Sequence, residues 1–414
     1  MGRAFFLMAA VIAVAAVLAP QAAPQGLGKQ IVVDKDKVQC PKANFTSIQA
    51  AVNAASPGDT IKVCPDQYNE SVTVNKPSLT LVGPTNVNLN KCGTVAPGDP
   101  TQDAVVTGGA SPSFTLANNN ITLSGFVIQG DTGVGIQTSD AFSGYRITNS
   151  LVQSNVVGVN FNSGGANQSR VDHNCIRTNS FEGLESEVGN LSNALVDHNA
   201  TFQNTSSSLD FTGAGARAYV TVTQNSSVSD GTGVTLDNSI GSSISQNTSQ
   251  GDGNGIGIGG QNNGLDVSGN VVQNSGGSGI YFSQGTFVPV YTAANVGLTV
   301  SGNTVSGAGG RGIRAVEGAP NLTYSTVSNN STSGNTLSGI ELGLGNDNNY
   351  VTNNGADKNG ANGIYAAGAV GNTFANNHMN LNVQFDARDD NRPANTWTGN
   401  QCTTDSPPGT ICGQ

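Results

Sequence analysis

Residues 265–272 read LDVSGNVV and residues 298–305 read LTVSGNTV, and variants of this phrase recur from about residue 121 to residue 400. Successive copies are 22 to 27 residues apart, except for one interval of 33 residues. A period in this range is typical of a solenoid, in which each repeat stacks only on its neighbours. An Asn, or a residue in its place, marks each copy, at Phe126, Ser150, Asn174, Asn199, Asn225, Asn247, Asn270, Asn303, Asn330, Asn354, Asn377 and Asn400.

A second phrase indicates what each repeat contains. It reads Gly-hydrophobic-x-hydrophobic, as in GVTL at residues 233–236 and GIYF at residues 279–282. Alternation at a period of two is typical of a strand with one buried face. No window after residue 60 has a sustained helical apolar stripe. We therefore predict an all-β protein whose short parallel strands wind into a right-handed parallel β-helix of about twelve coils.

The corners between these strands are rich in Gly, Asn and Ser. Asn suits a corner because its backbone tolerates the left-handed region. Asn side chains stacked from coil to coil can also hydrogen-bond along the helix axis and satisfy turn backbone groups.

The two ends of the chain differ from the repeats. Arg3 and the apolar run that follows it predict a signal peptide over residues 1–23, and hence a secreted or periplasmic protein. Residues 45–56, FTSIQAAVNAAS, have an amphipathic pattern that predicts a helix capping the first coil. We expect one β-helix domain over residues 31–414, with repeat coils over 121–400 and a closing segment over 401–414.

Composition limits the partners. The formal net charge is −10, and only Lys358 of the eight Lys lies beyond residue 91. Such a surface disfavours nucleic acid and anionic membranes. Beyond the signal peptide, no stretch is apolar and long enough to predict a membrane span. Neutral sugars, cations or cationic polymers are better candidates, and we expect a monomer.

The six Cys fit an exported protein. Cys40 and Cys64 are 24 residues apart, which is one coil's length, and Cys402 and Cys412 lie together near the C-terminus. We predict disulfides Cys40–Cys64 and Cys402–Cys412. We expect Cys92 and Cys175 to be free, or to pair only if the segment 85–113 folds back.

Residues 45–83, FTSIQAAVNAASPGDTIKVCPDQYNESVTVNKPSLTLVG, resemble the opening of right-handed parallel β-helix proteins of the pectin-lyase-like superfamily. The later repeats resemble those of the same superfamily, including its NosD-like periplasmic group. The resemblance implies the fold over residues 31–414. It leaves the activity open, because the superfamily holds lyases, hydrolases, epimerases and adhesins.

Stacking turns the repeat into a surface map. The residues expected to point outward from one strand face are Gly135, Asn160, Glu185, Asp210, Thr235, Gly257, Tyr281, Arg314, Glu341, Tyr365 and Gln384. Neighbours in such a row lie about 4.8 Å apart.

The first candidate site is acidic. Glu185 and Asp210 follow each other in the row, and Glu187 and Asp237 lie two residues further along their strands. Carboxyl groups this close either bind a cation or hold a proton that serves acid–base chemistry. We predict catalytic roles for Glu185 and Asp210, and a metal site, with calcium as the candidate ion, at Glu187 and Asp237. The alternative is a solvated acidic face.

Further along the row, Tyr281 and Tyr365 flank the ion pair of Arg314 and Glu341. Together with Asn160, these four residues are the candidate sugar-binding residues. The insertion SQGTFVPVYTAAN at residues 283–295 adds a long loop nearby, and such loops often carry binding.

A weaker candidate is the tandem motif VDHN. Asp172-His173 and Asp197-His198 occupy equivalent places in adjacent coils, and the first copy resembles the "WIDH" motif of pectate lyases without its Trp. Such pairs can bind a metal or move protons. The alternative is a corner ladder in which His replaces Asn.

We therefore predict a secreted protein that binds a polysaccharide or cell-envelope glycan, with cleavage or epimerisation as the candidate reaction. The alternatives are a non-catalytic adhesin or envelope structural protein, and a NosD-like periplasmic accessory protein. Copper handling would call for His and Met. The chain has three His, and after the signal peptide its only Met is Met379.

Overall fold

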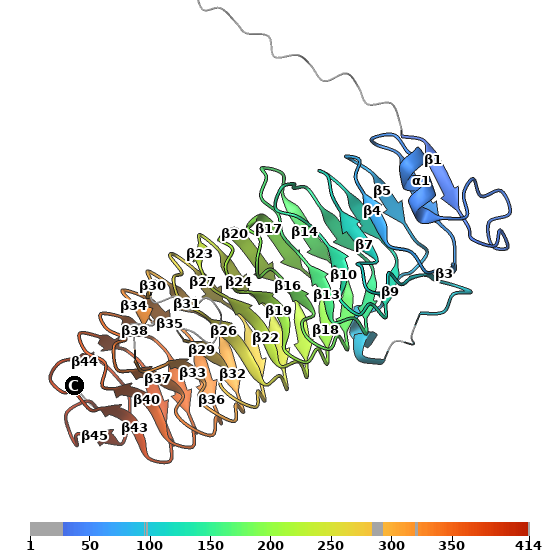
Figure 1. The fold of residues 1–414 in the computed structure, drawn as a ribbon. Helices are drawn as coiled ribbons and strands as arrows, with labels where there is room; N and C mark the ends of the chain where they lie inside the picture. Colours follow the sequence, from blue (N-terminus) through green and yellow to red (C-terminus); the bar gives the residue numbers. More distant parts are fainter. Residues whose placement is uncertain (1–27, 95, 97, 284–292, 319–321, 413–414) are drawn as a thin grey trace, which may run out of the picture.

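The structure is a computed structural model that describes residues 28–94, 96, 98–283, 293–318 and 322–412. It is an all-β solenoid in which the chain passes in turn through three long parallel sheets, here called sheets A, B and C (Figure 1). The predicted fold is confirmed. The predicted signal peptide lies outside the described residues.

Sheet A has sixteen strands. They are β1 (Gln30–Val33), β2 (Thr60–Val63), β5 (Thr80–Val82), β8 (Thr122–Ser124), β11 (Arg146–Thr148), β14 (Ser169–Asp172), β17 (Leu191–Asp197), β20 (Arg217–Thr223), β23 (Ser239–Ile240), β24 (Ser243–Ser245), β27 (Asp266–Ser268), β31 (Thr299–Ser301), β35 (Thr326–Ser328), β38 (Tyr350–Thr352), β41 (Thr373–Ala375) and β44 (Thr396–Thr398).

Sheet B has thirteen strands. They are β3 (Asp66–Tyr68), β6 (Ala104–Val106), β9 (Val127–Gln129), β12 (Leu151–Gln153), β15 (Cys175–Arg177), β18 (Ala200–Phe202), β21 (Ser226–Val228), β25 (Thr248–Gln250), β28 (Val271–Gln273), β32 (Thr304–Ser306), β36 (Ser331–Ser333), β39 (Gly355–Asp357) and β42 (His378–Asn380).

Sheet C has fourteen strands, and a further pair, β30 (Asn295–Val296) and β34 (Leu322–Thr323), forms a small sheet of its own. The strands of sheet C are β4 (Val72–Val74), β7 (Phe114–Leu116), β10 (Val134–Gln137), β13 (Val157–Asn160), β16 (Leu184–Glu185), β19 (Ser207–Phe211), β22 (Thr232–Leu236), β26 (Asn254–Ile258), β29 (Ile280–Phe282), β33 (Ile313–Ala315), β37 (Ile340–Gly343), β40 (Asn362–Ala367), β43 (Phe385–Asp389) and β45 (Asp405–Ser406).

The helix has about fourteen turns rather than the twelve predicted, since sheet C contributes one strand to each turn. The missing turns are at the N-terminal end. There β2, β4 and β5 form coils, but these coils lack the Asn marker phrase. The long segment between β5 and β6 also interrupts the repeat period. A count based on the marker phrase therefore starts too late.

The interior holds the expected aliphatic stack. Val159 pairs in register with Leu184, Leu184 with Leu209, and the column continues to Ile364. At the N-terminal end of the column, Ile136 and not Val134 pairs with Val159, and Ile136 is fully buried. The phrase GVGI, residues 133–136, contains two glycines that could begin the Gly-hydrophobic-x-hydrophobic phrase. The register of the strand corresponds to the second, Gly135, so that Ile136 takes the buried position.

The marker asparagines form a buried ladder along one corner. Each side-chain amide nitrogen donates to the amide oxygen of the next coil's Asn over 2.9 to 3.1 Å. Each Asn oxygen also accepts the backbone N–H of the residue one coil before. The ladder satisfies corner groups that would otherwise be buried without partners. Its members are Asn174, Asn199, Asn225, Asn247, Asn270, Asn303, Asn330, Asn354, Asn377 and Asn400.

The N-terminal end is covered by the helix α1 (Ile48–Ala54), shorter than the pattern over residues 45–56 suggested. Ile48, Ala51 and Val52 are buried in the core at the open end of the first coil. Ser47 caps the helix by accepting the N–H of Ala50. The helix thus covers apolar surface that no further coil would bury.

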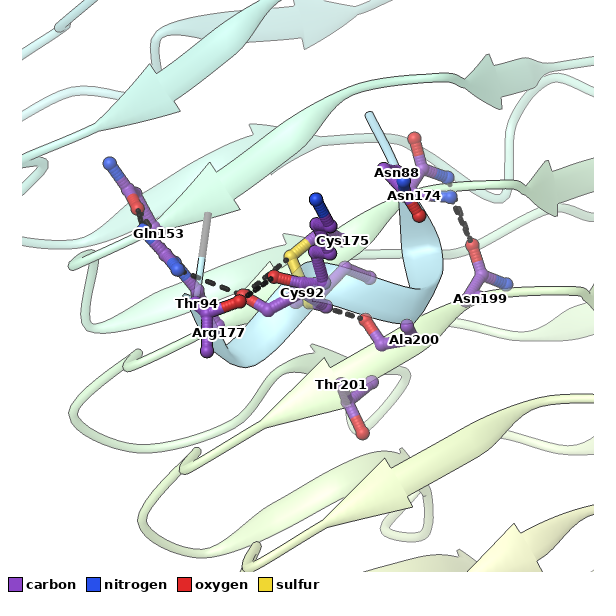
Figure 2. Close-up of a disulfide and its surroundings, with 12 residues drawn as sticks. Asn88, Cys92, Thr94, Gln153, Asn174, Cys175, Arg177, Asn199, Ala200 and Thr201 are labelled. Carbon is purple, nitrogen blue, oxygen red and sulfur yellow. Dashed lines mark hydrogen bonds between the residues drawn. A yellow bond between two sulfur atoms is a disulfide. The ribbon is translucent and has the colours of Figure 1, made fainter. Parts of the chain in front are cut away.

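Three disulfides link the described part of the chain. Cys40–Cys64 and Cys402–Cys412 are the two pairs inferred from the sequence. Cys92 and Cys175 are not free but bonded to each other. The segment 85–113 does fold back, because Cys92 lies in the 3₁₀ helix η1 (Leu89–Thr94), which contacts the outside of sheet B (Figure 2).

The strand surface under η1 explains this contact. Val127, Leu151 and Ala200 point outward from sheet B and form a small apolar cluster with the disulfide, separate from the main core. Arg177 donates to the carbonyl oxygen of Cys92 over 2.8 Å (Figure 2). No helix in the described residues is long and apolar enough to cross a membrane.

Candidate functional site on the outer face of sheet C

The predicted outward row is present from Asn160 to Tyr365, with every neighbouring pair in register. Its two ends differ from the expectation. Gln137, not Gly135, pairs with Asn160, and Arg388, not Gln384, pairs with Tyr365. The row therefore brings Asn160, Glu185 and Asp210 side by side, as the alternation predicted.

A cluster of carboxyl groups is built around this row, and we call Glu182, Glu185, Glu187, Asp210 and Asp237 the carboxyl cluster. All except the half-buried Glu187 are buried. Glu185 accepts a hydrogen bond of 2.6 Å from the amide of Asn160. Asp210 accepts one of 2.6 Å from the Thr212 hydroxyl, and Glu182 accepts the backbone N–H of Ser207 over 2.6 Å.

Burial makes these groups hold their protons. Burial raises the pKa of Glu182 to about 8, and the charge of Asp210 adds to the rise. Burial, with the charge of Glu187, raises the pKa of Glu185 to about 7. Burial also raises the pKa of Asp210, against the hydrogen bond from Thr212. Near neutral pH the cluster therefore contains both protonated and ionised carboxyl groups.

Arg217 lies within the cluster, although it belongs to β20 in sheet A. Its guanidinium is fully buried and approaches Asp237 to 3.6 Å between Nη1 and Oδ1. It also donates to the carbonyl oxygens of Gly213, Thr212 and Ser186. Burial raises the pKa of Asp237 to about 7, although Arg217 opposes the rise. The repulsion among the carboxylates is thus partly compensated.

Three of the carboxyl groups come close enough to share a cation. One oxygen each from Glu182, Glu187 and Asp210 can be chosen so that all lie within 4.8 Å of one another. Oxygen ligands of this kind suit calcium. The geometry differs from the predicted pair of Glu187 and Asp237, because Asp237 faces Arg217 instead.

Tyr281 reaches back toward the cluster over a glycine. A Cβ at position 257 would lie 2.6 Å from the Tyr281 hydroxyl oxygen, so only Gly257 leaves room for the phenol. The Tyr281 side chain hydrogen-bonds Thr232, and burial with the charge of Asp210 raises its pKa to about 12. Tyr281 thus presents a neutral hydroxyl beside the carboxyl cluster.

The other predicted sugar-binding residues lie further along the same row. Glu341 is 2.7 Å from Arg311 and 4.0 Å from Arg314, both measured from Nε to Oε1. Tyr365 donates to Asp390 over 2.5 Å, and the guanidinium of Arg388 lies over its ring at 4.6 Å. The insertion at residues 283–295 falls mostly outside the described residues.

The tandem VDHN motifs form a charge ladder at the corner between sheets A and B. Arg146 binds Asp172 with two nitrogens, at 3.3 and 3.2 Å, and Arg170 binds Asp197 at 2.8 and 2.6 Å. His173 and His198 stack with ring centroids 5.0 Å apart, and each Nδ1 contacts the Asp before it.

Both His residues have the left-handed backbone that Asn149, Gln224 and Gln246 adopt at the same corner in neighbouring coils. This placement is the one expected of a corner ladder in which His replaces Asn.

The sequence map missed Glu182 and Arg217. Glu182 sits at a corner before the strand, so strand alternation does not assign it to a face. A compositional signal was present, since three of the six Glu in the chain lie within residues 182–187. Arg217 had no such signal, because its role depends on a side chain that turns back from the start of β20.

Comparisons with known proteins agree with this fold. A family model described as periplasmic copper-binding protein (NosD) matches residues 165–407, which is more than half of the chain. The chain belongs to the NosD family. That family is described as periplasmic, and the three disulfides fit an oxidising compartment. No curated protein matches the sequence.

Two solved structures have similar folds. One is a mannuronic acid specific polysaccharide family 6 lyase from human gut microbiota, with 14% identity, 85% of this chain and 87% of that chain covered, and a TM-score of 0.56. The other is DFA-IIIase from Arthrobacter chlorophenolicus A6 without its lid, in complex with GF2, with 14% identity, 91% and 99% coverage, and a TM-score of 0.55. At this identity the likeness is one of fold.

The copper named in the family description finds a poor donor set in this chain. All six Cys are in disulfides, and Met379 is buried in the core. The stacked rings of His173 and His198 are parallel to within 2° at 5.0 Å, so their free nitrogens do not converge on one ion that binds each at about 2 Å. The ligand clusters among the described residues contain no His. The residues present do not fit a copper centre.

Proposed function

We propose that this NosD-family protein binds a polysaccharide along the outer face of sheet C and that Glu185 and Asp210 exchange protons with it during cleavage or epimerisation. The observation that carries the proposal is the carboxyl cluster on the outer face of sheet C, where burial raises the pKa of Glu185 to about 7 and also raises the pKa of Asp210. Both reactions need a proton to move to or from the sugar, and a carboxyl group with a pKa near 7 can do this in either direction.

Each member of the cluster has a role in this proposal. Glu185, with a pKa of about 7, gives up or takes the proton. Asp210 acts as its partner in the next coil, and Asn160 holds the Glu185 carboxyl through the 2.6 Å hydrogen bond. Tyr281 supplies a neutral hydroxyl that can donate to a sugar oxygen.

The row beyond the cluster extends the binding surface. Tyr281, Arg314, Glu341 and Tyr365 succeed one another coil by coil, so a linear chain lying along the helix axis would meet each in turn. Aromatic and guanidinium groups suit sugar rings and hydroxyls. In the proposal, Arg314 and Tyr365 therefore bind the sugar chain and hold it along the row.

The test is a screen of purified protein against polymannuronate, polygalacturonate, β-1,4-glucan and β-1,3-glucan. Binding, new reducing ends and the ultraviolet absorbance of unsaturated sugars are measured, and epimerisation is followed by NMR of the product. We expect turnover of one polymer, and a fall of kcat by about 10²-fold or more in Glu185→Gln and in Asp210→Asn with binding retained.

Asp266→Asn is the matched control, because it removes a carboxylate from β27 in sheet A, outside both the cluster and the row. Binding without turnover would overturn the proton transfer and favour the adhesin alternative. A protein that binds none of these polymers, or variants as active as the wild type, would overturn the proposal.

A further inference from the structure

A second surface, one corner away from the carboxyl cluster, has features that neither the fold nor the cluster requires. After each strand of sheet C the chain turns a corner into sheet A. Figure 1 shows β20, β23, β30 and β34 in order along this corner. Along this corner Ala218 pairs with Ile240, and Ile240 pairs with Asn263. Asn263 in turn pairs with Val296, and Val296 with Thr323.

The residue after each of these forms a column with left-handed backbone. Its members are Tyr219, Gly241, Gly264, Gly297 and Tyr324, with φ between 49° and 66°, and we call them the tyrosine–glycine column. Asn193 and Asn348 occupy the same column in the coils before and after it. Gly and Asn are ordinary residues at such a position, whereas an aromatic residue there is an outlier.

The two Tyr are placed as open platforms. Tyr219 is 68% exposed and Tyr324 is 67% exposed. The Tyr219 ring leans along the axis, because a Cβ at position 241 would lie 3.0 Å from its Cε1 atom. Among the residues that the structure describes, no atom lies within 4 Å of a Cβ built at Gly264 or at Gly297, so no described side chain covers these two positions between the rings.

The residues that line the column are apolar and uncharged, and this limits the kind of ligand it can bind. Ile240 and Val296 beside it are exposed, and the column residues carry no charge. In a chain of net charge −10, an uncharged apolar strip with two aromatic faces disfavours a ligand that is held by ion pairs. It suits the apolar faces of pyranose rings, which stack on tyrosine.

The spacing fits a chain molecule. The two rings are four coils apart, about 19 Å at about 4.8 Å for each coil. A sugar in an extended polysaccharide advances by roughly the rise of one coil, so a chain of about five residues is the shortest that reaches both rings. The glycines leave its path clear.

We infer that the tyrosine–glycine column is a second carbohydrate-binding surface, on which Tyr219 and Tyr324 stack against sugar residues of one linear polysaccharide. This inference rests on the proposed function in assuming that the ligand is a polysaccharide. It concerns residues outside the carboxyl cluster, so the two can fail separately. The column begins at Tyr219 in β20, the strand of sheet A that follows β19 and its Asp210.

The test uses tetrasaccharides and hexasaccharides of β-1,4-linked glucose and of β-1,4-linked mannuronate, with binding measured by calorimetry. In the series that binds, the hexasaccharide is expected to bind about tenfold more tightly than the tetrasaccharide. Tyr219→Ala and Tyr324→Ala should each remove this length dependence. Tyr350→Ala, which removes an exposed Tyr outside the column, should preserve it.

Gly264→Asn gives an independent test. Asn accepts the left-handed backbone and adds a side chain where the surface is open, so we expect weaker hexasaccharide binding with an unchanged melting temperature. Gly334→Asn is the matched control, since Gly334 also has a positive φ and open surroundings but lies at another corner.

The outcomes separate the inference from the proposed function. Turnover that depends on Glu185 and Asp210, together with hexasaccharide binding that neither Tyr variant weakens, overturns the inference and leaves the proposed function. If neither sugar series binds, the inference is overturned, and the screen of the four polymers still decides the proposed function separately. A dimer in sedimentation that the Tyr variants dissociate would show that a second copy covers the column, which also overturns the inference.

Discussion

Along the outer row of sheet C, the carboxyl groups of the two halves have different partners. In the C-terminal half, Glu341 lies 2.7 Å from the guanidinium of Arg311. In the N-terminal half, Glu185 takes its hydrogen bond from the neutral amide of Asn160, and burial raises its pKa to about 7. The backbone positions of the two halves are equivalent, since both belong to one continuous ladder.

The difference shows that the solenoid fixes where a side chain stands but not its charge state. A carboxyl group beside a guanidinium keeps its charge as half of an ion pair, whereas one buried among other carboxyl groups keeps its proton. In the N-terminal half, the Arg217 side chain forms an ion pair with Asp237 and donates hydrogen bonds to carbonyl oxygens at the corner. The N-terminal half is therefore the part of the row suited to proton transfer.

The largest expected effect tests the buried cation. Arg217→Met should lower the free energy of unfolding by about 3–5 kcal/mol, because it leaves buried Asp237 without its ion-pair partner and several carbonyl oxygens without their donor. Arg314→Met, in the C-terminal half, should cost about 1 kcal/mol or less, because the Arg314 side chain is partly exposed and its nearest Glu341 oxygen is 4.0 Å away. Denaturant unfolding measures both. Adding Asp237→Asn to Arg217→Met should recover part of the loss, and equal effects of the two single variants would contradict the comparison.

The pH dependence of stability is the next largest effect. The folded pKa values of Glu182, Glu185 and Asp237, about 8, 7 and 7, lie above the ordinary values of unfolded carboxyl groups near 4. The folded state therefore binds more protons between these limits, so their stabilising contribution is complete below about pH 4 and is lost as the pH rises through 7 to 8.

We expect the melting temperature to fall between pH 5.5 and pH 8.5, by an amount that corresponds to a few kcal/mol. Glu182→Gln combined with Asp237→Asn should flatten this slope, while Glu341→Gln should leave it. Thermal melts monitored by circular dichroism across this range measure it. A melting temperature that rises toward pH 8.5 would have the wrong sign.

Much of this arrangement could be predicted from sequence, for reasons that particular residues illustrate. The two-residue alternation and the repeat length were enough to place Glu185, Asp210 and Tyr281 in one row, because side-chain direction in a strand has no other freedom. The prediction failed at Gly135 because GVGI contains two glycines that could begin the phrase. It failed at Gln384 because no such glycine phrase precedes Arg388.

The rest depends on contacts that alternation does not encode. Glu182 and Arg217 act across corners, and Cys92 lies in a segment that belongs to no coil. Their partners are remote in sequence, such as Cys175, 83 residues from Cys92. A repeat map assigns faces to strands and has no information on where a corner side chain or an insertion folds.

Calcium should have a moderate effect that depends on pH. With Glu182, Glu187 and Asp210 as ligands, calcium at ten times its Kd stabilises the protein by about 1.4 kcal/mol. The rise in melting temperature should be greater at pH 8.5 than at pH 6, because protons compete for the same oxygens.

Asp210→Asn should remove the rise, and so should the double variant Glu185→Gln with Asp210→Asn. Asp237→Asn alone should retain it, which distinguishes this ligand set from the pair Glu187 and Asp237 expected from the sequence. Differential scanning calorimetry with and without calcium is the measurement. A melting temperature that calcium does not change at either pH would remove the cation site from the account.

The smallest effect is expected in the C-terminal half. A double-mutant cycle with Arg311→Ala and Glu341→Ala should give a coupling energy of about 1 kcal/mol, as is usual for a partly exposed ion pair. Unfolding in urea at low and high salt measures the coupling. A coupling larger than that between Arg217 and Asp237 would reverse the comparison of the two halves.

The central claim is that the carboxyl cluster holds protons at neutral pH, and an NMR titration tests it most directly. Labelling the Glu side-chain carboxyl carbon with ¹³C gives at most six signals, which Glu→Gln variants assign. We predict midpoints near pH 8 for Glu182 and near pH 7 for Glu185. Midpoints below about 5 for both would contradict the account, since ordinary carboxyl groups titrate there.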